Sequence, residues 1–336
     1  MIFLLSLISC AVDLETTAAT CSAQIASTSP FPDSTNMYHR DFISVELSEA
    51  DEAAYIALFD ANGSSIAGTS AHSGTQITFT PDRPLLPSHS YQVQVSYCGS
   101  PEPVSYTVQT SDLGEPLRDG TSSLIGKTYL VDVSSGRVLE PLGVGDLLQG
   151  LLQNTFLITV KDVVQDRLEV RVALTEAESE KQNFCVPSME EFPRIDVSES
   201  SYISVVENDI PINIAEHNFV LHDLVASGTI SPDGLYLGEI EVEGMLDLRE
   251  VAPIVQELGV TVEDAESFCD VLDGFDSACQ PCPTDAQPYC LAIVVDKIKA
   301  NEQPMQTYPV CESNCHERCS DIVDTCEEPQ STETCF

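Results

Sequence analysis

Apolar and polar residues alternate along short segments over most of the chain, and this pattern constrains the fold more than any other feature. In YQVQVSYC, residues 91–98, Tyr91, Val93 and Val95 share one face of a strand. The same alternation occurs in FISVELSE, residues 42–49, and in RLEVRVAL, residues 167–174. Successive side chains of a strand point to opposite sides, so this period of two is typical of half-buried antiparallel strands. We therefore expect a mainly β protein.

Cysteine abundance constrains the compartment. The chain has 13 cysteines in 336 residues, a content that favours an oxidising environment and structural disulfides. Thirteen is odd, so one cysteine is expected to have another role. If that residue is Cys10, twelve remain. The sequence leaves open how ten of these pair: Cys185, Cys269, Cys279, Cys282, Cys290, Cys311, Cys315, Cys319, Cys326 and Cys335.

The chain is strongly acidic, with 54 Asp and Glu against 14 Lys and Arg and a net charge of −40. Such a chain repels the phosphate backbone of nucleic acids and the surfaces of anionic lipids. We therefore expect no nucleic-acid binding and no attachment to membranes through a basic patch. We expect the charge to serve a hydrated surface. Weak binding of divalent cations by clustered carboxylates is the alternative. Because the sequence contains no calcium-loop motif, we predict no dedicated metal site and no cofactor.

The N-terminal segment MIFLLSLIS, residues 1–9, is apolar and ends at Cys10. Leu7-Ile8-Ser9-Cys10 resembles the lipobox of bacterial lipoproteins. The resemblance implies that residues 1–9 are a signal, that Cys10 carries lipid, and that residues 10–21 form a tether. Stable anchoring requires more than one acyl chain, which such lipidation supplies. The segment is short and has no Lys or Arg, which a start upstream of Met1 would explain. The alternative is an apolar first strand.

A run of segments in the N-terminal third has a recognisable order: STSPFPDS, FISVELSEA, ALFDANGSSIAGT and QITFTPDRPLLPSHSYQVQVSYC. The order resembles the SbsA-type Ig-like domain of bacteria and covers residues 22–110. The resemblance implies a seven-stranded sandwich that acts as a spacer or adhesive module and has no catalytic residues. Cys98 falls on the outer side of its strand, so we expect a Cys21–Cys98 bridge to join the start of the domain to a strand end. Such a bridge contributes about 4 kcal/mol in the chain-entropy model.

The remaining chain is expected to contain a linker (residues 111–123), a second domain (124–300) and a Cys-rich tail (301–336). The second domain is predicted to be an antiparallel sheet or open barrel with two or three helices. One helix follows Asp247, and Thr261 with Asp264 resembles a capping box for another. Parts of this region resemble uncharacterised lipoproteins predicted in Gram-negative bacteria, which implies no function. The strands are expected at 127–133, 155–163, 167–174, 201–207, 219–230, 235–246 and 289–298.

Two cysteine groups have the spacing of chemical sites. Cys279 and Cys282 have the separation of a thiol-redox motif, and the tail sequence CESNCHERC, residues 311–319 with His316, approximates a zinc-binding pattern. In a Cys-rich exported chain, disulfides are the expected state. The sequence contains no GxSxG, HExxH or P-loop motif, so we predict no catalytic residues and no enzyme activity.

An apolar stripe gives the second domain one candidate ligand site: Leu147, Leu148, Leu151, Leu152 and Phe156. Either the stripe completes the core, or it lines a pocket for a lipid or another apolar molecule. A continuous dry cavity would favour the second interpretation, and side chains filling that space would reject it.

These observations together predict a non-catalytic exported lipoprotein. We expect it at the outer membrane, because Ala11 follows the lipidated cysteine, with a structural, adhesive or assembly role. Its expected partners are the membrane, through the anchor, and proteins of the cell envelope. A carrier of an apolar ligand and a zinc or thiol-redox protein are the alternatives.

Overall fold

The computed structural model describes residues 21–141, 155–176, 179–199, 201–214, 217–257, 262–275 and 277–310. They divide into two compact units, each described by itself below. The first comprises residues 21–85 and 90–109, and the second comprises Leu86–His89 and the residues from Thr110 onward. Several predicted sites lie outside the described residues: Cys10, Leu147, Leu148, Leu151, Leu152, Cys311, Cys315, His316, Cys319, Cys326 and Cys335.

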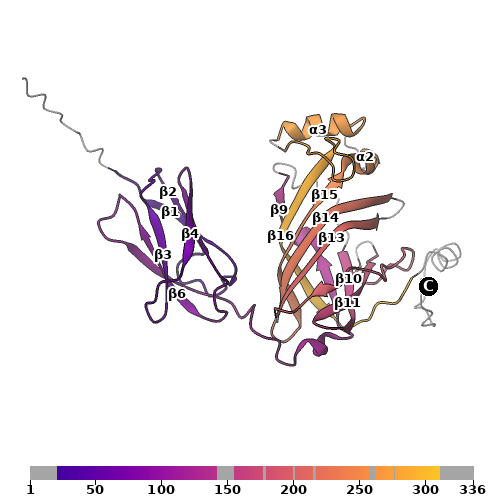
Figure 1. Ribbon diagram of the computed structural model, residues 1–336, viewed down its shortest axis with the longest axis horizontal. Helices are drawn as coiled ribbons and strands as arrows, with labels where there is room; N and C mark the ends of the chain where they lie inside the picture. The colour runs from indigo at the N-terminus through magenta and orange to yellow at the C-terminus, as the bar shows by residue number, and fades with distance from the viewer. Residues whose placement is uncertain are drawn as a thin grey trace, which may run out of the picture. The chain divides into compact units, whose positions relative to one another are not determined.

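The first unit is a sandwich of two antiparallel sheets, as its alternating segments predict (Figure 1). Residues 21–110 are all described and contain seven strands. One sheet has the order β1-β2-β5-β4 and the other β3-β6-β7. Inward side chains such as Val45, Leu58 and Val93 are fully buried between them. The strands are β1 (Ile25–Ser29), β2 (Ile43–Leu47), β3 (Tyr55–Asp60), β4 (Gly68–Ser73), β5 (Gln76–Pro81), β6 (Ser90–Ser96) and β7 (Val104–Gln109).

The second unit is one sheet that closes on itself. Its strands pair antiparallel in the order β8-β10-β11-β12-β13-β14-β15-β16, and β16 pairs with β8 to complete the ring. β9 pairs with β16 along the edge opposite β15, the same edge that pairs with β8 further along the strand. The sequence left a twisted antiparallel sheet and an open barrel as alternatives, and the β15–β16 and β16–β8 ladders close the sheet into a ring. The strands are β8 (Thr128–Asp132), β9 (Arg137–Glu140), β10 (Thr155–Val163), β11 (Arg167–Leu174), β12 (Ile195–Asp196), β13 (Tyr202–Ile214), β14 (His217–Ile230), β15 (Tyr236–Asp247) and β16 (Cys290–Gln303).

The ring is weakest at β12. This strand has two residues, pairing with β11 through two positions and with β13 only through Asp196 and Ser204. The segment 179–194 therefore forms the wall beside most of β11. Its backbone pairs at two isolated bridges, Val172–Met189 on β11 and Thr175–Gln182 just after β11 ends.

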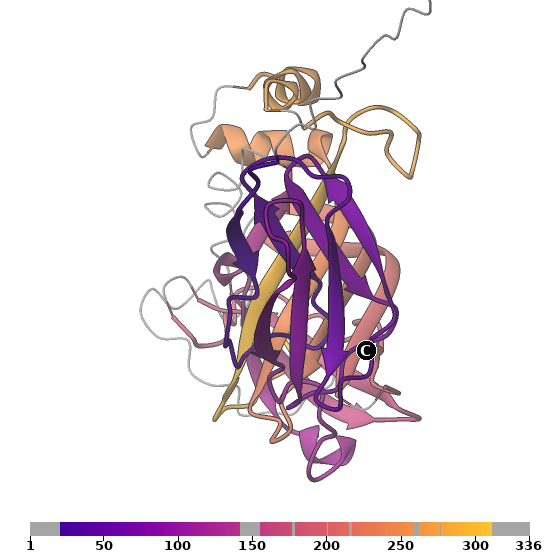
Figure 2. The same ribbon diagram turned by 90° about the vertical axis from the view of Figure 1, so that its left-hand side faces the viewer.

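Two helices lie at one end of the second unit's sheet, in both views of the structure (Figures 1 and 2). These are α2 (Leu248–Glu257) and α3 (Ala265–Asp273). The expected helix after Asp247 is present as α2. The Asp247 carboxylate accepts a hydrogen bond from the Arg249 N–H at 2.9 Å at the start of this helix. The predicted capping box is shifted: Asp264 is the N-cap of α3 and exchanges hydrogen bonds with Ser267, so Asp264 opens the box that we expected it to close.

The segment that we expected to be a linker, residues 111–123, belongs to the second unit. The Arg118 N–H donates to the Pro232 carbonyl at 2.9 Å, and Leu117 packs against the core of the ring. A short 3₁₀ helix at Thr121–Leu124 then leads into β8. In the part of the chain that the structure describes, no helix is both long enough and apolar enough to cross a membrane.

Candidate ligand-binding cavity

The interior of the ring is apolar because inward positions recur at every second residue. On β11 these are Leu168, Val170 and Val172, and on β13 they include Ile203 and Val205, all nearly inaccessible to solvent. A ring of eight strands leaves an interior that side chains can just fill or that holds one small ligand. The size of the inward side chains therefore decides whether the interior is solid.

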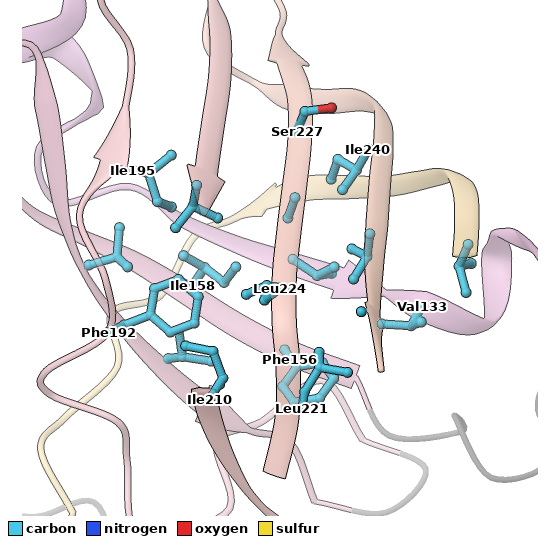
Figure 3. A pocket seen from close by; sticks show the side chains of 18 of the residues that line it. Val133, Phe156, Ile158, Phe192, Ile195, Ile210, Leu221, Leu224, Ser227 and Ile240 are labelled. Atoms are coloured by element: carbon cyan, nitrogen blue, oxygen red, sulfur yellow. The ribbon is translucent and has the colours of Figure 1, made fainter. Parts of the chain in front are cut away.

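The interior contains a cavity of about 350 Å³. All eight strands of the ring line it, and one end is lined by Leu248 and Val251 of α2 and by Phe268 of α3. Figure 3 shows side chains of β10, β13 and β14, including Phe156, Ile210 and Leu224, that lie around the same space. The volume lies within the range of small-molecule sites, which begins at about 300 Å³.

Three of the residues that line the cavity have polar side chains: Tyr129, Ser204 and Ser227. The Tyr129 hydroxyl donates a hydrogen bond to the Gly234 carbonyl at 2.9 Å, and burial raises the pKa of this phenol well above its ordinary value. Since Val205 pairs with Ala226 on the inward face, the adjacent Ser204–Ser227 pair belongs to the outward face. Consistent with this register, Figure 3 shows Ser227 at the margin of the apolar side chains.

The wall segment 179–194 contributes Met189 and Phe192 to the cavity. Its position is fixed by Glu190, whose carboxylate accepts hydrogen bonds from Nε and Nη2 of Arg171 and from the Ser188 hydroxyl. Burial alone would raise the pKa of Glu190, but these bonds and the charges of Arg171 and Lys161 outweigh it and hold the pKa below its usual value. The carboxylate is therefore ionised at neutral pH and holds the wall against β11.

A second polar contact joins the same wall to the irregular segment that follows β16 in sequence. The buried Gln182 side chain donates to the Tyr308 carbonyl and accepts from the Tyr308 N–H, both at 2.7 Å. Arg171 Nη1 also donates to the Thr307 carbonyl at 2.7 Å. The polar groups around the wall thus bond one another outside the cavity, which leaves its interior apolar.

The helical end of the ring is held by an ion-pair cluster and two disulfides. Arg249 pairs with the buried Asp247 and with Asp285, and its guanidinium lies 5.5 Å from the Tyr289 ring centre. Burial would raise the pKa of Asp247, but hydrogen bonds from Arg249 hold it below its ordinary value. The disulfides are Cys269–Cys279, which links α3 to the following loop, and Cys282–Cys290.

One group of residues at this end has the spacing of a metal site. Ligand atoms of Asp247, Cys282 and Cys290 all lie within 4.8 Å of one another. However, Cys282 and Cys290 are bonded to each other, and metal binding requires thiolates. The group is therefore a structural cluster in this oxidised state. Because Cys279 is also bridged, Cys279 and Cys282 do not form a redox pair with each other.

The structure also shows where the other predicted cysteines lie. Cys21 and Cys98 form a disulfide with their Cα atoms 5.8 Å apart, the pair that we expected. Cys185 is disulfide-bonded too. Of the predicted pocket residues, Phe156 lies on β10 and lines the cavity. Its four leucine companions are outside the described residues.

Comparison with known proteins identifies the first unit. Residues 19–98 match the bacterial Ig-like domain family. The N-terminal unit is thus a bacterial Ig-like domain, a kind of module typical of bacterial surface proteins. The match covers less than a third of the 336 residues and does not reach the second unit. No curated protein matches the chain.

A search of solved structures finds an L,D-transpeptidase from Mycobacterium smegmatis, with 9% sequence identity over 61% of this chain and 76% of that one. Its TM-score of 0.22 is too low to support any argument about fold or function. The function of the second unit must therefore be inferred from its own cavity. The Ig-like domain indicates a structural role at a bacterial surface.

Sequence reasoning missed most of the residues that form the cavity. It named Phe156, but not Phe192 or Ala226, which line the cavity from the wall segment and from β14. The alternation on β11 was a usable signal for the inward face of that strand, whereas on β14 a register shift between His222 and Val225 interrupts the period. The alternation did not show that the ring closes around unfilled volume.

Proposed function

We propose that the second unit binds an apolar ligand, such as a lipid acyl chain, inside its closed sheet. The observation that carries this proposal is the apolar cavity of about 350 Å³. Apolar cavities of less than half this volume are known to stay dry and to take up apolar molecules. Among the alternatives that the sequence left open, the carrier is therefore the one that the geometry favours.

The size of the cavity argues against a simple packing defect. At about 24 cal/mol per Å³, an empty volume of 350 Å³ corresponds to about 8 kcal/mol of packing free energy that the fold does without. Whole domains are stable by only about 5–15 kcal/mol. A ligand that fills the space would recover part of this free energy, which supports a binding role.

The other parts of the chain suit an exported carrier. We propose that the Ig-like domain is a spacer and that Cys10 is a lipid anchor, which would hold the carrier at the cell envelope, in the outer membrane. Disulfides in both units support an oxidising compartment. We also propose that the protein is not an enzyme. Supporting this, the hydroxyl-bearing residues of the described lining are Tyr129, whose hydroxyl is bonded to Gly234, and Ser204 and Ser227, which belong to the outward face of the sheet.

The direct test is a titration of the oxidised full-length protein with N-phenyl-1-naphthylamine, an uncharged dye whose fluorescence rises in apolar surroundings. We expect a saturable increase with one dye per protein, reversed by 1-dodecanol, since both compete for one space. An increase that does not saturate, or that 1-dodecanol leaves unchanged, would contradict the carrier function.

A further inference from the structure

We infer that the ligand of the cavity is uncharged along its whole length, so that the site selects neutral lipids, alcohols or esters over fatty-acid anions. This inference rests on the proposed binding function and specifies its ligand class. Three features of the second unit carry it: the lining, the pairing of the surrounding cations, and the charge of the outer surface.

The lining offers nothing to an ionised head group. Among the described lining residues none carries a charge, and the Tyr129 hydroxyl already donates to Gly234. Ser204 and Ser227 belong to the outward face of the sheet, because their neighbours Val205 and Ala226 face the cavity. A carboxylate taken into this space would lose its hydration without gaining a hydrogen-bond donor, which is strongly unfavourable.

Cations at two places on the cavity wall are already paired with carboxylates. On the wall beside β10 and β11, Lys161 and Arg171 both contact Glu190, and Arg194 pairs with Glu169. At the helical end, Arg249 is held between Asp247 and Asp285. An anionic head group at the surface near either place would have to displace a carboxylate of the protein to gain a cation. The exchange gives no net ion pair.

The outer surface adds a repulsive field. On β15, Glu241 is partly buried and close to the negative charges of Glu243 and Asp296. Its pKa is raised, first because of burial and second because of these two charges. The whole chain carries −40, with only 14 Lys and Arg to offset its acids. Anions are therefore repelled as they approach, whereas an uncharged chain of equal length is not.

A matched series of probes tests the inference: 1-dodecanol, methyl dodecanoate and dodecanoate, each displacing N-phenyl-1-naphthylamine from the oxidised full-length protein at neutral pH. All three share one chain length and differ in the head group. We expect the alcohol and the ester to bind with similar affinities, and the anion at least about tenfold more weakly than either. Probe concentrations stay below the onset of micelle formation, which light scattering monitors.

The outcomes separate this inference from the proposed function. Dodecanoate binding as tightly as methyl dodecanoate, or more tightly, would overturn the selectivity and leave the carrier function standing. If no member of the series displaces the dye, and the dye itself does not bind, the carrier function fails and the inference fails with it.

Discussion

Val225 and Ala226 are consecutive residues of β14 that face opposite sides of the closed sheet. Ala226 borders the cavity, whereas Val225 is 40% exposed and pairs with the exposed Val206. The two positions allow one substitution to be tested on either side of the same strand. An Ala226→Phe side chain would occupy part of the cavity, so we predict that it weakens dye binding at least about tenfold.

The matched control for this change is Val225→Phe, which adds a ring to the outer face of the same strand. We predict that it leaves dye affinity unchanged. Fluorescence titration measures both, and circular dichroism shows whether each variant folds. Equal loss of binding in the two variants would mean that the dye does not occupy the cavity.

Glu190 gives a pH-dependent prediction about the wall segment. The Glu190→Gln substitution weakens its charge-assisted bonds to Arg171, so we expect a loss of about 1–2 kcal/mol in the free energy of unfolding at neutral pH. The folded-state pKa of Glu190 is lowered, so its stabilisation is present above the ordinary value of 4.5 and is lost as pH falls through the folded value. Urea unfolding should therefore show the difference from wild type shrinking below about pH 4.5. A difference that grows with acidification would contradict this assignment.

Removal of the Cys269–Cys279 bridge tests whether the helical end of the ring contributes to ligand binding. The bridge joins residues ten positions apart and ties α3, which carries Phe268, to the following loop. Replacing both cysteines by alanine should lower stability by about 3 kcal/mol in the chain-entropy model. We also expect weaker dye binding, because Phe268 lines the cavity. Thermal unfolding and dye titration measure the two effects.

The control for that variant is replacement of Cys21 and Cys98 by alanine. This pair lies in the Ig-like domain, so its loss should destabilise that domain and leave dye affinity as in wild type. If dye affinity fell equally in both double variants, the bridge at the helical end would have no specific role in binding.

The proposed anchor makes a separate prediction. Cells that express the protein and are supplied with radioactive palmitate should label the wild type, because lipidation at Cys10 requires the thiol. The Cys10→Ser variant should be unlabelled. A Cys21→Ala/Cys98→Ala variant, which keeps Cys10, serves as the control and should be labelled. Equal labelling of wild type and Cys10→Ser would rule out the anchor.

Local sequence patterns predicted the strands well, since alternation along segments such as residues 91–98 depends only on which face is buried. They missed β9 and β12, whose four and two residues are too few to show a period. Asp264 was recognised as part of a cap, but its partner is Ser267 and not Thr261. A capping box is a local motif. The expected pair, Thr261 with Asp264, and the observed pair, Asp264 with Ser267, overlap and start about one helical turn apart.

The closure of the ring and the cavity were harder to predict, because neither is a local property. Closure depends on β16 pairing with both β15 and β8, which are far apart in the chain. Phe156 was a candidate for either the core or a pocket from its place in an apolar stripe, but Phe192 comes from a segment without a regular pattern. Whether inward side chains fill a ring is decided by the sum of their volumes in three dimensions.

The central claim is that the closed sheet holds an apolar chain, and a crystal structure with a halogenated ligand tests it most directly. The ligand is 1-dodecanol brominated at its terminal carbon, and anomalous scattering locates the bromine. We predict a bromine peak inside the ring, in contact with side chains that include Phe156, Leu224 and Ala226. A peak found only on the outer surface, with the interior filled by side chains, would contradict the account.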